Sequence, residues 1–170
     1  MTKRLSSNEL RAEVQKFPFW YHKIDLGEGV ITPGYNFDPI WDMIRRTRKH
    51  IDYRDKKVLD LASFDGMWAF EAEKLAARLV VATDCYYETF KKFLFCKEVL
   101  GSDVIPYYNI SPYDMWNRLD VFLQESFGEK KNLTNAFLMS CSIWGFYITL
   151  GIPCLRCLKH GLLFAREAIC

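Results

Sequence analysis

Short apolar runs alternate with helix-length segments between residues 57 and 108. The runs rich in branched and aromatic residues predict strands near 57–61, 79–83 and 104–108. Met67 to Ala77 contains neither Gly nor Pro and predicts a helix, as does Tyr86 to Leu100, which Gly101 ends. Apolar strands that alternate with helices are typical of a parallel sheet, so we expect an α/β fold with the first strand in the middle.

The N-terminal 56 residues predict a helical and aromatic segment that precedes the sheet. A helix is expected to begin at Ser7 and to end before Pro18. The stretch 19–34 is aromatic and punctuated by glycines, which predicts a loop or a short hairpin. Asp38, followed by a proline, predicts the N-cap of a second helix that runs to about Ile51. The apolar residues expected to be buried by this helix are Ile40, Trp41 and Ile44.

Acidic residues close the first two predicted strands, and they suggest a ligand site. Asp60 and Asp84 would lie at the carboxyl ends of parallel strands, where ligands bind in open α/β sheets. Asp84 is suitably spaced to accept hydrogen bonds from a ribose diol. The turn after the first strand keeps one glycine, Gly66, and Asp65 beside it would repel a phosphate. These features favour a cationic, phosphate-free ligand such as S-adenosylmethionine (SAM). The alternatives are a nicotinamide-binding oxidoreductase, which the missing glycines disfavour, and an ordinary βαβ unit whose acids are only solvated.

The same stretch resembles a known family. The segment 58–73, V-L-D-L-A-S-F-D-G-M-W-A-F-E-A-E, resembles motif I of the class I SAM-dependent methyltransferases, closest to the branch of the tRNA wobble-uridine (carboxy)methyltransferases. Upstream, F-P-F-W-Y-H-K-I-D-L-G at 17–27, continued by T-P-G at 32–34, is similar to the F-P-W-Y-H-x-I-D-L-G…T-P-G segment of that branch. The resemblance covers about residues 16 to 121. Ala62 and Phe64 stand where the general motif has glycines, which narrows the space for the methionine end of SAM.

This resemblance implies a fold, a cofactor and a set of site residues. The fold would be a Rossmann-like methyltransferase sheet, incomplete at about four of seven strands, and the activity would be methyl transfer from SAM to RNA or a small molecule. In the family an acidic residue after the third strand commonly contacts the adenine amino group, and Asp114 is the candidate here. The expected cofactor-binding residues are Asp60, Ala62, Ser63, Asp65, Gly66, Asp84, Cys85 and Asp114. No metal is required, and the sequence assigns no catalytic residue.

Composition and charge narrow the setting. A length of 170 residues fits one domain. The net charge of +2 is too small to attract the protein strongly to nucleic acid or to a membrane. No apolar run reaches membrane-spanning length and the N-terminus lacks a signal-peptide core, so we expect a cytoplasmic protein whose six cysteines are thiols. The basic run from Arg45 to His50 is either a solvated helix end or a patch for an RNA phosphate.

The last 35 residues break the pattern. In the related branch the fourth strand reads approximately F-D-V-V-L-x-x-G-V-L-Y-H-L-R-H-P-L, which the segment 137–154 does not match. Because the genetic code is degenerate, the nucleotides that encode this segment could encode the family's sequence when read in a shifted frame. In that frame the codons of Trp144 and Gly145 together must supply a Gly codon. We therefore divide the chain into a lid segment at 1–56, a SAM-binding core at 57–135 and an atypical tail at 136–170. One hypothesis is that the tail is translated out of frame and that the chain is a non-catalytic fragment. A zinc site at Cys154, Cys157 and His160 is a weaker alternative, because a second ligand pair is missing.

Overall fold

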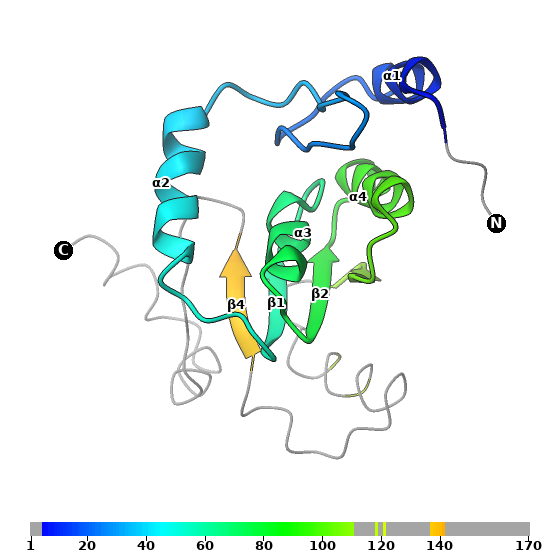
Figure 1. Ribbon diagram of the computed structural model, residues 1–170. Helices are drawn as coiled ribbons and strands as arrows, with labels where there is room; N and C mark the ends of the chain where they lie inside the picture. Colours follow the sequence, from blue (N-terminus) through cyan, green and yellow to red (C-terminus); the bar gives the residue numbers. More distant parts are fainter. Residues whose placement is uncertain (1–4, 111–117, 119–120, 122–136, 142–170) are drawn as a thin grey trace.

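A four-stranded, wholly parallel sheet forms the centre of the protein (Figure 1). The computed structural model describes residues 5–110, 118, 121 and 137–141. The strands are β1 (Lys57–Leu61), β2 (Leu79–Asp84), β3 (Ile105–Tyr108) and β4 (Phe137–Cys141). Their order in the sheet is β3-β2-β1-β4, which places β1 between β2 and β4. The predicted α/β class, the parallel pairing and the position of the first strand are confirmed.

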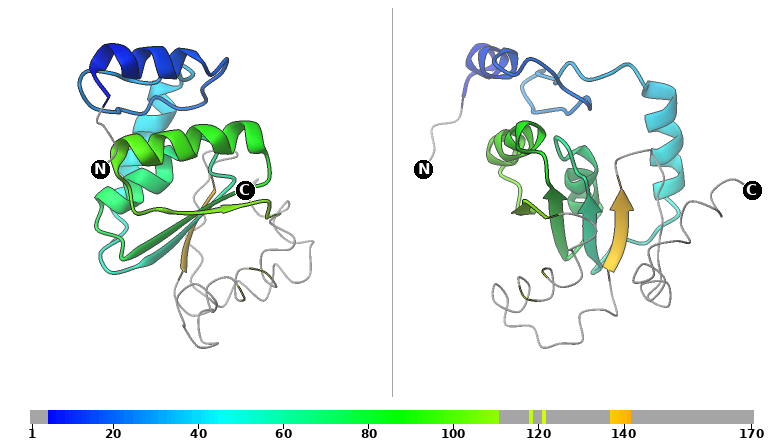
Figure 2. Two further views of the ribbon diagram at one scale, coloured as in Figure 1. Left: turned by 90° about the vertical axis from the view of Figure 1, so that its right-hand side faces the viewer. Right: turned by 180° about the vertical axis from the view of Figure 1, so that it is seen from behind.

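Two helices connect these strands and pack on the sheet. Helix α3 (Met67–Lys74) follows β1, and α4 (Tyr87–Leu100) follows β2. Figures 1 and 2 show both helices over the same face, as expected when successive right-handed crossovers advance in one direction. A left-handed Gly101 ends α4, as predicted. Pro106 lies in β3, which pairs only with β2 in the described sheet, so the proline is accommodated at an edge.

The N-terminal segment consists of two helices and a short hairpin. Helix α1 (Ser7–Gln15) begins with a capping box in which Ser6 and Glu9 bond to each other's backbone N–H groups. The aromatic segment, defined here as residues 17–37, then forms a hairpin with an antiparallel bridge between Asp25 and Ile31. It lies above the carboxyl ends of the strands (Figure 1).

Helix α2 (Asp38–Arg48) differs from its prediction in three details. Phe37, rather than Asp38, is the N-cap, and the helix ends at Arg48 instead of near Ile51. Ile40 was expected to be buried, but it is exposed. The buried stripe runs through Trp41, Ile44 and Arg48, and Ile40 lies one residue, about 100° around the helix, from its nearest member.

One hydrophobic core joins the N-terminal segment to the sheet. The core includes Leu10 and Val14 of α1 together with Trp20, Trp41 and the α3 residues Trp68 and Phe70. Gly66, at the start of α3, permits the close approach of α4, because a Cβ there would collide with the Phe93 ring. The division at residues 56 and 135 stays a prediction.

Candidate functional site

The turn at the carboxyl end of β1 has an unusual backbone. Ala62 and Phe64 adopt φ values of +51° and +53°, in the left-handed region that glycine prefers. These are the two positions at which the motif that this segment resembles carries glycine. Ser63 N–H donates to the Thr83 carbonyl at 2.9 Å, and Gly66 N–H donates to the Ser63 carbonyl at 2.8 Å. The turn therefore keeps a glycine-type conformation without most of the glycines.

Asp84 connects this turn to the end of β2. Its carboxylate accepts the Phe64 N–H at 2.9 Å through one oxygen and the Tyr86 N–H at 2.8 Å through the other. Burial raises the pKa of Asp84, and the backbone hydrogen bonds from Tyr86 and Phe64 oppose that rise. The Cys85 backbone and the Thr89 side chain also donate toward this carboxylate and further oppose the rise.

The other predicted site residues fall into three groups. Asp60 and Ser63 are fully buried beneath the turn. Cys85 follows Asp84 and is exposed. Asp114 lies outside the residues that the structure describes. The structure therefore brings the two strand-end aspartates and the turn together at the carboxyl ends of β1 and β2.

Asp65 faces the aromatic segment. Its Oδ2 accepts the backbone N–H groups of Tyr21 and His22, each at 2.9 Å, and its Oδ1 contacts His22 Nδ1. Both side chains of this pair are about 1% exposed or less. Sequence reasoning treated Asp65 as a cofactor residue and did not pair it with His22. A histidine within an otherwise apolar cluster was the available signal, because a buried imidazole needs a partner.

The aromatic segment fits closely against the turn. A Cβ at Gly34 would lie 2.5 Å from the backbone of His22, so only glycine permits this approach. The Tyr21 ring stacks on Phe64 with centroids 4.7 Å apart and 14° between the planes. Burial, followed by the charge of Asp65, raises the pKa of Tyr21, so its phenol is protonated at neutral pH. The segment thus covers the turn through both polar and ring contacts.

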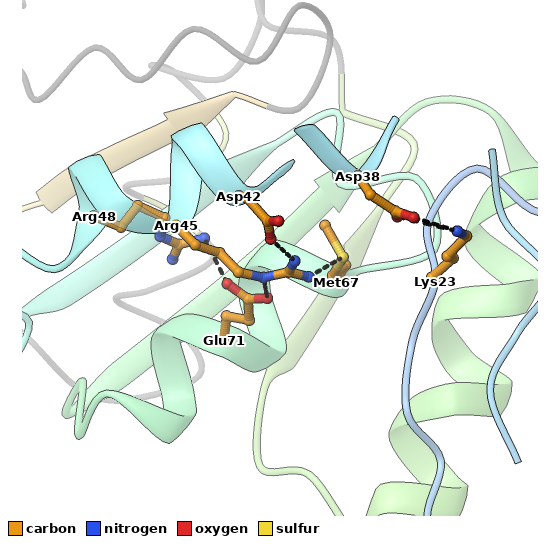
Figure 3. A network of polar contacts seen from close by, with 7 residues as sticks. All are labelled: Lys23, Asp38, Asp42, Arg45, Arg48, Met67 and Glu71. Atoms are coloured by element: carbon orange, nitrogen blue, oxygen red, sulfur yellow. Dashed lines mark hydrogen bonds and ion pairs between the residues drawn. The ribbon is translucent and has the colours of Figure 1, made fainter. Parts of the chain in front are cut away.

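Part of the basic run on α2 is used inside the protein (Figure 3). Arg45 Nε donates to Glu71 of α3 at 2.8 Å, and this carboxylate contributes to raising the pKa of Arg45 against the effect of burial. Arg48 is 1% exposed and donates to the Tyr53 hydroxyl at 3.0 Å and to the Trp68 carbonyl at 3.1 Å. These two arginines therefore fasten α2 to the rest of the fold.

Two further findings concern metals and membranes. Among the described residues, no group of three or more His, Cys, Asp or Glu side chains is placed to hold a metal ion. None of the helices in the described part of the chain combines the length and apolarity that a membrane span needs. The Cys154–His160 zinc alternative lies outside the described residues.

Comparisons with known proteins identify the fold. No model of a known protein family matches the chain, and no curated protein matches it. The N-terminal domain of EvdMO1 with SAH bound is 15% identical over 67% of this chain and 49% of that chain, with a TM-score of 0.50. The ribosomal protein L11 methylase from Lactobacillus delbrueckii subsp. bulgaricus is 20% identical over 55% of this chain and 58% of that chain, with a TM-score of 0.43.

This likeness shows the fold alone, which is a partial, methyltransferase-like Rossmann fold. The chain spans about half the length of the solved structures that it matches.

Proposed function

We propose that the chain binds SAM at the carboxyl ends of β1 and β2, as in SAM-dependent methyltransferases. The observation that carries the proposal is Asp84, which bonds to the backbone of the glycine-type turn and lies at the carboxyl end of β2, where an acidic residue can accept hydrogen bonds from a ribose diol. The left-handed backbone at Ala62 and Phe64 supports it, because the family's motif has glycine at both positions.

The residues proposed to hold SAM act in different ways. Asp84 would accept the ribose hydroxyls, and the backbone of Ala62, Ser63 and Gly66 would flank the cofactor. Cys85 and Asp114 are proposed near the adenine and Asp60 beneath the cofactor. Asp65 holds the aromatic segment over the turn through the N–H groups of Tyr21 and His22. When bound, SAM supplies an electrophilic methyl group for in-line displacement, and the protein's contribution is proximity and orientation.

Side chains at the turn favour SAM over a dinucleotide. In G-x-G-x-x-G the second glycine lets the backbone approach the pyrophosphate, and the corresponding position here carries the bulky Phe64 side chain. The buried Asp65 does not contribute to this choice in the way the sequence suggested, because its carboxylate is engaged by the aromatic segment. A nicotinamide-binding oxidoreductase is therefore the weaker candidate.

We further infer a relationship to the tRNA wobble-uridine branch, because F-P-F-W-Y-H-K-I-D-L-G and T-P-G here are similar to the F-P-W-Y-H-x-I-D-L-G…T-P-G segment of that branch. The close fit of Gly34 on His22 gives that pattern a structural role in covering the turn. Because the chain spans about half of the matched structures, methyl transfer by this chain is a separate proposal from SAM binding. A fragment that binds SAM without transferring its methyl group is the second candidate.

Alkylation of Cys85 tests the location of the site. The exposed thiol directly follows Asp84, so SAH (S-adenosylhomocysteine) should slow its reaction with iodoacetamide, measured by peptide mass spectrometry. The buried Cys96, whose thiol pKa is raised well above its usual value by burial, should stay unmodified with or without SAH. Protection of Cys85 by NAD but not by SAH would contradict the proposal.

A further inference from the structure

Lys92 of α4 is a buried cation with no polar partner in the described part of the chain. The residue is 5% exposed, and its ammonium makes neither a hydrogen bond nor an ion pair there. Its contact is the face of the Phe19 ring, 4.9 Å from the ammonium to the ring centroid. Burial lowers the pKa of Lys92, and the nearby charge of Asp65 opposes that effect.

The carboxylates near Lys92 are committed elsewhere. Asp65 accepts two backbone N–H groups and contacts the His22 ring. Glu88 pairs with Lys91 at 2.8 Å. Because the Lys92 side chain is largely buried and its ammonium has no hydrogen-bond acceptor among the described residues, an external anion at this position would supply one.

A series of aromatic rings, of which the first two are exposed, continues from this cation to the proposed cofactor turn. Phe19 contacts Tyr35 edge to face at 5.2 Å, and both are more than one-third exposed. Tyr35 contacts Tyr21 at 5.9 Å, and Tyr21 stacks on Phe64 in the turn. Rings arranged edge to face can accept a further planar ring at their free surfaces. The exposed rings and the cation together suit a planar molecule with a negative charge.

The charge distribution favours a small molecule over RNA. Binding of RNA relies on several phosphate contacts, and the basic run on α2 was the candidate surface for them. Within that run Arg45 is bonded to Glu71 (Figure 3), and Arg48 is buried against Tyr53 and Trp68. These contacts leave Arg46, Lys49 and His50 as the exposed basic residues of the run. Lys92 by contrast presents a single cation beside the edge-to-face rings of Phe19 and Tyr35, which matches one anionic group on one ring system.

We propose that Lys92, Phe19 and Tyr35 form the subsite for the methyl acceptor, a planar aromatic small molecule that carries a carboxylate or a phenolate. The proposal rests on the proposed function for its role as acceptor site, because the ring contacts lead to the turn where SAM would lie. The subsite itself is defined by the cation and the rings, independently of SAM.

Binding of benzoate to the full chain tests this subsite by ligand-observed NMR. Benzoate should bind more tightly than benzamide, which lacks the charge, and than cyclohexanecarboxylate, which lacks the ring. Lys92→Met should weaken benzoate binding by about tenfold or more, since a charge-assisted contact is lost. Lys92→Arg should retain most of the binding, and the matched control Lys91→Met should retain all of it, because Lys91 pairs with Glu88. Phe19→Leu, which keeps the ammonium, should also weaken benzoate, and thermal melts will show that each variant is folded.

Four results would overturn the proposal. The first is an absence of benzoate binding to the folded wild type, and the second is equal binding by Lys92→Met and Lys91→Met. The third is a Lys92→Met variant that binds benzoate normally, loses affinity for SAH and keeps its affinity for 5′-methylthioadenosine. Because 5′-methylthioadenosine lacks the carboxylate of SAH, this result would assign Lys92 to the cofactor carboxylate. The fourth is Phe19-dependent binding of a single-stranded RNA oligonucleotide by a protein that ignores benzoate. If benzoate binds in a Lys92-dependent manner and SAH does not bind, the proposed function is contradicted and the anion subsite is still supported.

Discussion

At the scale of single residues, Asp65 and Asp84, two of the four aspartates predicted to bind cofactor, have different surroundings. Asp84 could be placed from its position after an apolar strand, because the end of a strand fixes which edge of the sheet a residue occupies. The pairing of Asp65 with His22 could not, since the two residues lie 43 positions apart and meet only when the aromatic segment folds back over the turn. Local periodicity carries no information on such a contact.

Removing the Asp65 carboxylate should destabilise the fold. Asp65→Ala leaves two buried backbone N–H groups and the His22 ring without their acceptor, so we expect the free energy of unfolding to fall by about 3 kcal/mol. Asp55→Asn is the control, because Asp55 is exposed and adopts a positive φ that asparagine tolerates. Urea denaturation should show the control within about 0.5 kcal/mol of wild type. Equal stability of the two variants would show that the pair does not fasten the segment.

The left-handed backbone at Ala62 gives a second prediction. Ala62→Gly relieves the cost of a Cβ at φ +51°, so it should leave the free energy of unfolding unchanged or raise it by up to about 1 kcal/mol. Ala69→Gly, within α3, should instead lower it by about 1 kcal/mol, since glycine in a helix interior is unfavourable. Thermal melting of both variants checks the contrast. A similar loss at the two sites would argue against a strained turn.

The raised pKa of Asp84 predicts a pH dependence. Its folded pKa lies above the ordinary 3.8, so the folded state keeps a proton that the unfolded chain has already lost. The resulting stabilisation is complete below 3.8 and is lost as the pH rises through the folded pKa. Relative to Asp84→Asn, which does not titrate, wild-type stability should therefore decline from about pH 4 upward. Urea denaturation at several pH values will measure the difference, and a constant difference would contradict the burial of this carboxylate.

At the scale of elements, the type and order of the helices and strands were predictable from the sequence, but the exact buried face of each helix was not. Strands β1 and β2 and helices α3 and α4 follow from apolar runs and from composition, because these signals are local. The exposure of Ile40 was missed, since α2 buries a narrow stripe that includes the charged Arg48. An arginine in a core position depends on acceptors from other elements, here Tyr53 and the Trp68 carbonyl.

Arg48 should contribute more to stability than its neighbour on the same helix. Arg48→Met removes buried hydrogen bonds to the Tyr53 hydroxyl and the Trp68 carbonyl, so the free energy of unfolding should fall by about 2–4 kcal/mol. The matched control is Arg46→Met, because Arg46 lies on the same helix and is exposed. Its effect should stay within about 0.5 kcal/mol. Chemical denaturation will measure the free energy of unfolding of both variants. A larger loss for Arg46→Met than for Arg48→Met would contradict the structural role of Arg48.

At the scale of the whole molecule, the α/β class and the central place of β1 were predicted because parallel strands with helical crossovers allow few arrangements. The resemblance implied a sheet of about four strands, and β4 does pair in parallel with β1 although its segment does not match the family's fourth strand. The out-of-frame hypothesis for the tail concerns residues that otherwise lie outside the described part of the chain. The nucleotide sequence of codons 120 to 140 tests it, and a frame that restores the family's strand pattern would support a damaged gene.

Calorimetric titration of the full chain with SAH and with NAD tests the central claim most directly. The account predicts binding of SAH and not of NAD, and a loss of about 1–3 kcal/mol in SAH affinity for Asp84→Asn, because the proposed hydrogen bonds to the ribose lose their charged acceptor. Asp103→Asn, which removes an exposed carboxylate outside the site, should bind SAH as wild type does. Preferential binding of NAD, or equal SAH affinity of the Asp84 and Asp103 variants, would contradict the claim that Asp84 and the turn after β1 form a SAM site.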